Sequence, residues 1–230
     1  EVPHRYAPVL RVQRRVRASG EDRMTIVPFE CRDRETIPEY CDSCVIPGDC
    51  ITYMLSLPNE CVDLICTSPP YKANKSYEEW ASFEDYEDFA DKWIEQASRI
   101  LTKTGTMMLN VGYTKIARNE TLPLTYLYHR LATKYGLKLV QEIVWRYFGG
   151  MAYKLRYTHR TERIMWLAKD PNNCTFNLDE VRVKEWKAYD KRNNPLGKNP
   201  TDIWEIKRVV GGSGASEMKY NHPAQFPYAL

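Results

Sequence analysis

The stretch Cys61–Tyr71 constrains the fold most, because it joins a short apolar run directly to two consecutive prolines. Residues 61–66 have no helical period and follow a turn-like segment at 58–60, which predicts a buried strand. The prolines lack N–H groups and have fixed φ angles, so they neither extend a ladder nor start a helix here. Ser68, which precedes them, is pushed to the extended region. The sequence therefore predicts a stiff loop at the carboxyl end of a strand, where open α/β sheets bind ligands.

The side chains of this loop favour one kind of chemistry. Carbonyl oxygens and the Ser68 hydroxyl can hold an exocyclic NH₂ group, and the Tyr71 ring can stack on the base that carries it. Lys72 and Lys75 follow and could contact phosphate or remain solvated. A rigid turn with a core tyrosine is the alternative interpretation.

Apolar periodicity predicts further elements on both sides of the loop. We expect helices at residues 50–57, 82–101 and 122–135 and strands at residues 106–111, 137–147 and 163–169. Ser82 is a suitable N-cap, with Asp85 three residues later as in a capping box. The order of helices and strands predicts an α/β protein with part of a doubly wound sheet.

The composition excludes several classes of protein. No apolar run approaches the roughly 20 residues that span a membrane, and no signal peptide is evident, so we expect no membrane association. Seven cysteines, an odd number, argue against a disulfide scaffold and favour a reducing compartment. We expect a cytoplasmic or nucleoid-associated protein, or a nuclear one if the source is eukaryotic.

Cys41 and Cys44 have the spacing of a zinc knuckle, and Cys31 and Cys50 flank them less regularly. Reduced, partly buried thiols are the favoured interpretation, and we predict no metal.

Two segments are locally basic although the net charge is only +3. Residues 1–44 begin with an arginine-rich arm, which is either solvated or in contact with phosphate. Within the loop-rich segment 170–220, positions 182–208 hold eight Lys or Arg against four Asp or Glu, with tryptophan and tyrosine interleaved. Such a segment is typical of nucleic-acid contact, although a decorated surface domain is the alternative. The candidate nucleic-acid-binding residues here are Arg182, Lys184, Lys187, Lys191 and Arg192.

Several motifs in this order resemble one family. They are Gly48-Asp49 before a short helix, Thr67-Ser68-Pro69-Pro70-Tyr71, His159-Arg160-Thr161-Glu162, Asp202-Ile203-Trp204-Glu205 and the segment His222 to Pro227. The chain resembles the S-adenosylmethionine-dependent DNA amino-methyltransferases of the permuted (β) class. In that family Ser-Pro-Pro-Tyr accompanies mostly cytosine N4 methylation, and Asp-Pro-Pro-Tyr mostly adenine N6 methylation.

The resemblance implies a Rossmann-like methyltransferase sheet that comprises the catalytic half, with a mixed hairpin at its edge. Residues 45–169 would form this half, residues 170–220 a target-recognition insert, and residues 221–230 the start of the cofactor-binding half. The implied partners are double-stranded DNA and S-adenosylmethionine. The implied catalytic residues are Ser68, Pro69, Pro70 and Tyr71, and the implied cofactor-binding residues are Asp49, Thr67, His222, Pro223 and Phe226. Asp49 would look the same as a plain helix N-cap.

The family's glycine-rich cofactor turn, Asp-Pro-Phe-x-Gly-x-Gly, does not occur in these 230 residues. We therefore expect a further segment or a second chain to supply it. The rival activities are N6-adenine methylation, non-catalytic DNA binding and, less favoured, action on RNA or on a protein glutamine amide.

Overall fold

The computed structural model describes residues 46, 48–73, 78, 80–118, 120–149, 152–184, 194–210 and 224–230. These residues divide into two compact units. Unit 1 comprises the described residues up to Gln141 together with Met165–Thr175, and unit 2 comprises Glu142–Ile164 and the described residues from Phe176 onward. The division passes through strands β5 (Lys138–Arg146) and β6 (Thr161–Ala168), so both strands contribute residues to each unit.

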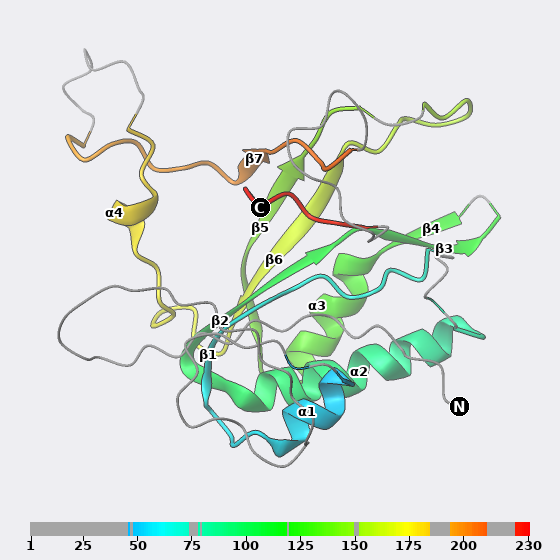
Figure 1. The fold of residues 1–230 in the computed structure, drawn as a ribbon, viewed down its shortest axis with the longest axis horizontal. Helices are drawn as coiled ribbons and strands as arrows, with labels where there is room; N and C mark the ends of the chain where they lie inside the picture. The colour runs from blue at the N-terminus through cyan, green and yellow to red at the C-terminus, as the bar shows by residue number, and fades with distance from the viewer. Residues whose placement is uncertain are drawn as a thin grey trace. The chain divides into compact units, whose positions relative to one another are not determined.

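Five of the described strands form one sheet in the order β1-β2-β6-β5-β7 (Figure 1). Strand β1 (Val62–Thr67) runs parallel to β2 (Leu101–Val111), and β5 runs parallel to β7 (Ile203–Glu205). Helices are interspersed with the strands along the chain, which confirms the predicted α/β class.

Strand β7 lies outside β5, so the β5–β6 pair lies one strand in from that edge of the sheet. At the base of the connection between β5 and β6, the Tyr147 N–H donates to the Arg160 carbonyl at 2.9 Å. The sequence did not predict β7 as a strand, because three residues carry too little periodic signal.

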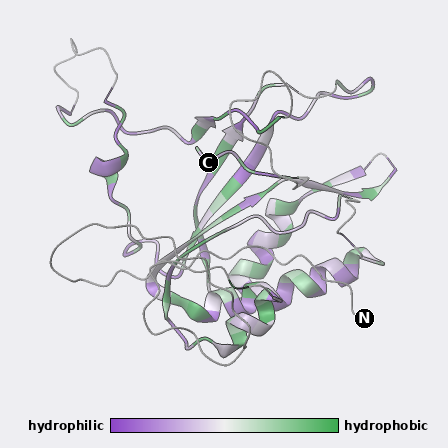
Figure 2. Ribbon diagram, viewed as in Figure 1, coloured by the Kyte–Doolittle hydropathy of each residue, from purple (hydrophilic) through white to green (hydrophobic). Residues whose placement is uncertain are grey.

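The three helices of unit 1 are α1 (Cys50–Ser56), α2 (Phe83–Ile100) and α3 (Leu124–Lys134), and α2 contacts the other two (Figure 1). Helix α2 begins as predicted, because the Ser82 hydroxyl accepts from the Asp85 N–H and the Asp85 carboxylate accepts from the Ser82 N–H. Apolar and polar residues alternate along α2 at helical spacing (Figure 2). Its apolar face is buried in a core that includes Ile65 of β1 and Leu109 of β2.

Two boundaries differ from the prediction. Helix α2 ends at Ile100 and β2 begins at Leu101, whereas the Thr104-Gly105 pair predicted a turn between them. Leu101 pairs with Val62 across the sheet, with a register shift before Leu64, so tertiary pairing overrides the local turn signal. The predicted start of the third helix instead forms β4 (Glu120–Pro123), which pairs antiparallel with β3 (Tyr113–Ala117) in a separate two-stranded sheet. Helix α3 stops as predicted near Gly136, whose φ is +80°.

Unit 2 contains the short helix α4 (Leu178–Val181) and the β5–β7 pairing. The Trp145 indole N–H donates to the Ile206 carbonyl at 2.8 Å, which fixes the segment after β7 to β5. Among the described ranges, no helix has both the length and the apolar character needed to cross a bilayer.

Arg99, in the last turn of α2, connects three elements of unit 1. Its Nη1 donates to the Leu57 carbonyl and to Asn59 Oδ1, both at 2.8 Å, and its Nη2 donates to the Met54 carbonyl at 2.5 Å. The guanidinium therefore satisfies carbonyls at the end of α1 and fixes the turn that leads into β1.

We predict that Arg99→Met lowers the free energy of unfolding by roughly 2–3 kcal/mol, because it leaves part-buried carbonyls without their charged donor. Arg130→Met is the matched control, since Arg130 forms an ion pair with Glu87 near the surface. This control should cost about 0–1 kcal/mol. Urea denaturation of both variants measures the difference, and equal losses would contradict the role given to Arg99.

Candidate functional site

The Ser68–Tyr71 loop follows β1 at the carboxyl end of that strand, as predicted. Thr67, the last residue of β1, pairs with Leu109 of β2, so the loop lies beside the carboxyl end of β2 as well. Pro69 is buried, whereas Ser68, Pro70 and Tyr71 are half-buried. The loop is therefore partly accessible and backed by the core of unit 1.

The Tyr71 hydroxyl is the centre of a hydrogen-bond network. It lies 2.9 Å from Ser68 Oγ, donates to the Asn110 carbonyl at 3.1 Å, and accepts from Asn110 Nδ2 at 2.8 Å. A phenol has a single proton. The Asn110 carbonyl can only accept, whereas either hydroxyl can be the donor between Ser68 and Tyr71. The Ser68 oxygen has two lone pairs, so in either arrangement it can accept from another group.

Three further contacts fix the backbone of the loop. The Tyr86 hydroxyl of α2 donates to the Pro70 carbonyl at 2.7 Å, and the Thr114 hydroxyl of β3 donates to the Lys72 carbonyl at 3.0 Å. The Tyr71 N–H donates to Glu78 Oε1 at 3.1 Å. Lys72 has a φ of +52°, a left-handed conformation that is unfavourable for a residue with a side chain. The surrounding contacts hold the chain in this turn.

Behind the loop lies a buried pair of phenols. Tyr86 and Tyr128 are both fully buried, and their hydroxyl oxygens are 2.9 Å apart. Since Tyr86 donates its proton to Pro70, Tyr128 donates to Tyr86. Burial raises the pKa of both phenols well above the usual value, with the neighbouring Tyr128 adding to the effect on Tyr86. Both tyrosines therefore act as neutral hydrogen-bond groups.

The sequence interpretation missed the four residues that support the loop. They are Tyr86, Asn110, Tyr128 and Thr114, to which the sequence alone assigned no part in the loop. A weak signal was present, because a buried tyrosine or asparagine in an apolar stripe needs a hydrogen-bond partner. Which partner each residue finds is a property of the tertiary structure.

The predicted cofactor-binding residues have different surroundings. Asp49 caps α1, and its Oδ1 accepts from the Thr52 N–H at 2.8 Å and from the Thr52 hydroxyl at 2.9 Å. The Thr67 hydroxyl is buried and has no hydrogen-bond partner among the described residues. Phe226, in unit 2, packs edge-on against Trp145 with ring centroids 5.8 Å apart. His222 and Pro223 lie outside the described residues.

Of the predicted nucleic-acid-binding residues, Lys72, Arg182 and Lys184 are described, whereas Lys75, Lys187, Lys191 and Arg192 lie outside the described ranges. The Arg182 guanidinium forms several hydrogen bonds within unit 2. It donates to Asp179, to the Gly197 carbonyl and to Asn199, and the side chain is only 10% exposed. These hydrogen bonds hold the Arg182 side chain within unit 2, so Arg182 is not among the phosphate contacts proposed below.

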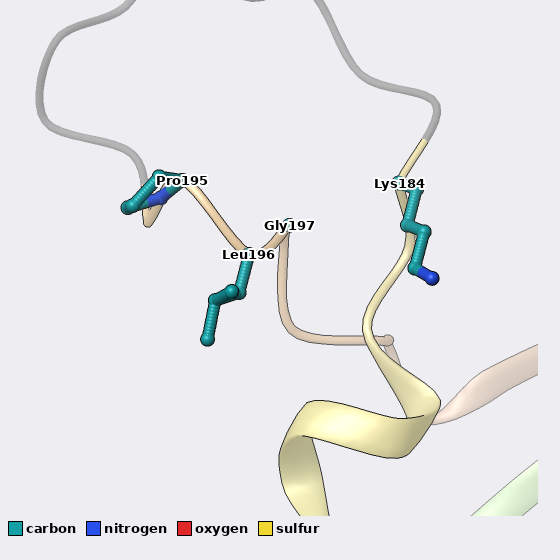
Figure 3. Close-up of a pocket in the computed structure, with 4 residues that line it drawn as sticks. All are labelled: Lys184, Pro195, Leu196 and Gly197. Carbon is teal, nitrogen blue, oxygen red and sulfur yellow. The ribbon is translucent and has the colours of Figure 1, made fainter.

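Lys184 lies beside a small cavity of unit 2, opposite Pro195, Leu196 and Gly197 (Figure 3). Val183 and Lys198 form a two-way backbone bridge next to it. Gly197 has a φ of +118°, and a Cβ there would lie 2.8 Å from the Val183 carbonyl oxygen, so this close approach requires glycine. None of the predicted catalytic residues lines the cavity.

The cysteines show no metal-binding group within the part of the chain that is described. Cys31, Cys41 and Cys44 lie outside it. Cys50 is buried at the start of α1, and burial raises the pKa of its thiol to about 11. Desolvation likewise raises the pKa of Cys66, the cysteine nearest the loop, so its thiol stays protonated near neutral pH.

Comparison with known proteins identifies relatives along most of the chain. The profile of a family described as DNA methylase (N6_N4_Mtase) matches residues 62–230. The type II methyltransferase M.ScaI of Streptomyces caespitosus is 36% identical over 200 residues, which cover 84% of this chain and 65% of that enzyme. The DNA adenine methyltransferase YhdJ of Escherichia coli is 30% identical over 202 residues, covering 81% of this chain and 64% of that enzyme.

A solved structure of the cytosine-N4-specific PvuII DNA methyltransferase has a similar fold. Its TM-score is 0.57 at 16% sequence identity, over 78% of this chain and 64% of that one. The match with both curated relatives extends over slightly less than two thirds of their length. On the extent of the profile match and of the identity to M.ScaI, the chain belongs to the DNA methylase family.

Proposed function

We propose that this chain carries the catalytic loop of a DNA methyltransferase that transfers a methyl group to the exocyclic amine of a base. The observation that supports this most is the placement of the Ser68 hydroxyl, which lies 2.9 Å from the Tyr71 hydroxyl in a half-buried loop. The Ser68 oxygen keeps a lone pair that can accept a hydrogen bond, as an NH₂ group requires. The loop is also held by contacts to α2, β2 and β3, so its acceptors are preorganised.

In this mechanism the target base leaves the duplex stack, at a cost of a few kcal/mol. Its amine donates to the Ser68 oxygen and to the Pro69 carbonyl, and the accessible part of the Tyr71 ring stacks on the base. These bonds orient the nitrogen lone pair for attack and take up both N–H groups. Correct positioning of this kind can lower a barrier by roughly 7–11 kcal/mol. No cysteine nucleophile is needed.

The methyl donor is S-adenosylmethionine, which supplies an electrophilic methyl carbon. Thr67, at the end of β1, is the proposed contact with S-adenosylmethionine, because its buried hydroxyl has no hydrogen-bond partner among the described residues. Asp49, His222, Pro223 and Phe226 are further proposed contacts, from the resemblance. A segment or second chain that carries a glycine-rich turn would complete the cofactor site.

Basic residues near the loop and in the insert are proposed phosphate contacts, because a duplex offers closely spaced negative charges. They are Lys72, Lys75, Lys184, Lys187, Lys191 and Arg192.

Cytosine N4 is the first candidate target, because the loop reads Ser-Pro-Pro-Tyr. Adenine N6 is the second, since the Escherichia coli relative is described as a DNA adenine methyltransferase. We predict N4-methylcytosine in DNA from cells that express the full-length protein, measured by mass spectrometry of digested nucleosides. N6-methyladenine alone would support the second candidate. The absence of both methylated nucleosides would contradict the proposed activity.

We predict that Tyr71→Ala lowers the rate of methyl transfer by at least about 100-fold, because it removes both the stacking ring and the hydrogen-bond partner of the Ser68 hydroxyl. Tyr71→Phe keeps the ring and should lose roughly tenfold, as expected for one lost hydrogen bond. Tyr126→Ala is the control, since Tyr126 is 67% exposed on α3. Duplex affinity should change little in all three variants. Near-normal transfer by Tyr71→Ala would rule out the stacking role.

Tyr86 is a proposed positioning residue, and Tyr86→Phe tests it without removing the buried ring. We predict that kcat falls roughly tenfold while KM for the duplex stays constant, because the Pro70 carbonyl loses its anchor. The matched control is Tyr135→Phe, whose hydroxyl donates to Asp91 Oδ2 at 2.9 Å at the surface. If Tyr86→Phe lowers the unfolding temperature without any change in kcat, Tyr86 is only a structural residue.

A further inference from the structure

The connection between β5 and β6, residues 147–160, is unusually cationic and aromatic. It contains Lys154, Arg156 and Arg160, no Asp or Glu, and four tyrosine or phenylalanine residues. Residues 147–149 and 152–160 of the loop are described, and all lie in unit 2.

Leu155 and Tyr157 are the most exposed large apolar side chains in the described part of the protein, at 96% and 98%. The next in order, Tyr228 and Tyr126, are 74% and 67% exposed. Single exposed apolar residues are ordinary, but two almost fully exposed ones on alternate positions of one loop indicate a surface that a partner covers.

The cations alternate with these apolar side chains. Lys154 precedes Leu155, and Arg156 lies between Leu155 and Tyr157. The Arg156 guanidinium lies 4.4 Å from the centre of the Tyr153 ring, which orders the arginine while it stays exposed. The bond from the Tyr147 N–H to the Arg160 carbonyl closes the base of the loop, and the Tyr153 N–H donates to the Thr158 hydroxyl at 3.3 Å within it.

We propose that the β5–β6 loop binds duplex DNA, with Lys154 and Arg156 on phosphates and Leu155 and Tyr157 against sugars and base edges in a groove. Alternating cations and exposed rings without any acidic residue suit a polyanion that also has flat apolar faces. A protein partner fits less well, because the centres of protein interfaces are depleted of lysine. The choice of DNA rests on the proposed function, whereas the exposure and charge of the loop do not.

The test is a salt titration of the full-length protein with a fluorescent 30-base-pair duplex of random sequence, followed by anisotropy. Lys154→Ala combined with Arg156→Ala should reduce the slope of log K against log salt by about 1.8, since each phosphate contact contributes about 0.9. If the two proteins bind equally at about 1 M salt, this difference in slope makes the affinity of the variant up to about 60-fold lower than that of the unmodified protein at 0.1 M salt. Leu155→Ala combined with Tyr157→Ala should weaken binding about tenfold with an unchanged slope, because apolar contacts release no counterions.

Two control variants match these changes. Lys92→Ala combined with Lys103→Ala removes two exposed lysines from α2 and β2, and Tyr126→Ala removes an exposed ring from α3. Neither should alter affinity or slope. If the loop variants behave like these controls while the unmodified protein binds the duplex, the inference is wrong but the proposed function stands. If the unmodified protein binds no duplex, the proposed function fails as well. If the loop variants lose binding to anionic lipid vesicles to the same extent as binding to the duplex, the loop binds polyanions in general and the assignment to DNA is overturned.

Discussion

The hydrogen bond from Tyr86 to the Pro70 carbonyl joins the most unusual loop of this protein to its core. A Pro-Pro pair offers no N–H groups, so the loop cannot be held by a regular backbone ladder and depends on side-chain donors. Tyr86 supplies one from the first turns of α2, a helix whose start is fixed by the Ser82–Asp85 capping box. The placement of the loop thus depends on where α2 begins.

Much of this arrangement could be predicted from local signals. The strand at Val62–Thr67 followed from an apolar run and the prolines, and α2 followed from its cap and its 18 residues of periodic sequence. The start of β2 at Leu101 could not be predicted, because pairing with Val62 outweighs a Thr-Gly turn signal. The β3–β4 pair was missed because its strands are short.

The candidate site was predictable only where it depends on the local sequence. The stiffness of the loop is a local property of Ser68, Pro69 and Pro70, so the sequence alone indicates it. The contacts of Tyr71 with Asn110, 39 positions away, and of Tyr86 with Tyr128, 42 positions away, depend on how β2, α2 and α3 pack. Sequence periodicity places such residues in the core but does not assign partners to their hydroxyl groups.

The two buried phenols have a consequence for the conditions under which the loop keeps its shape. Burial raises the pKa of Tyr86 and Tyr128 so far that neither loses its proton in mildly acidic or mildly alkaline solution. A histidine or carboxylate in the same place would gain or lose charge somewhere in that interval and would release the Pro70 carbonyl when it did. This uncharged support keeps its hydrogen bond to the Pro70 carbonyl throughout that interval, so any acid or alkaline limb in the behaviour of the protein must originate in groups other than these two phenols.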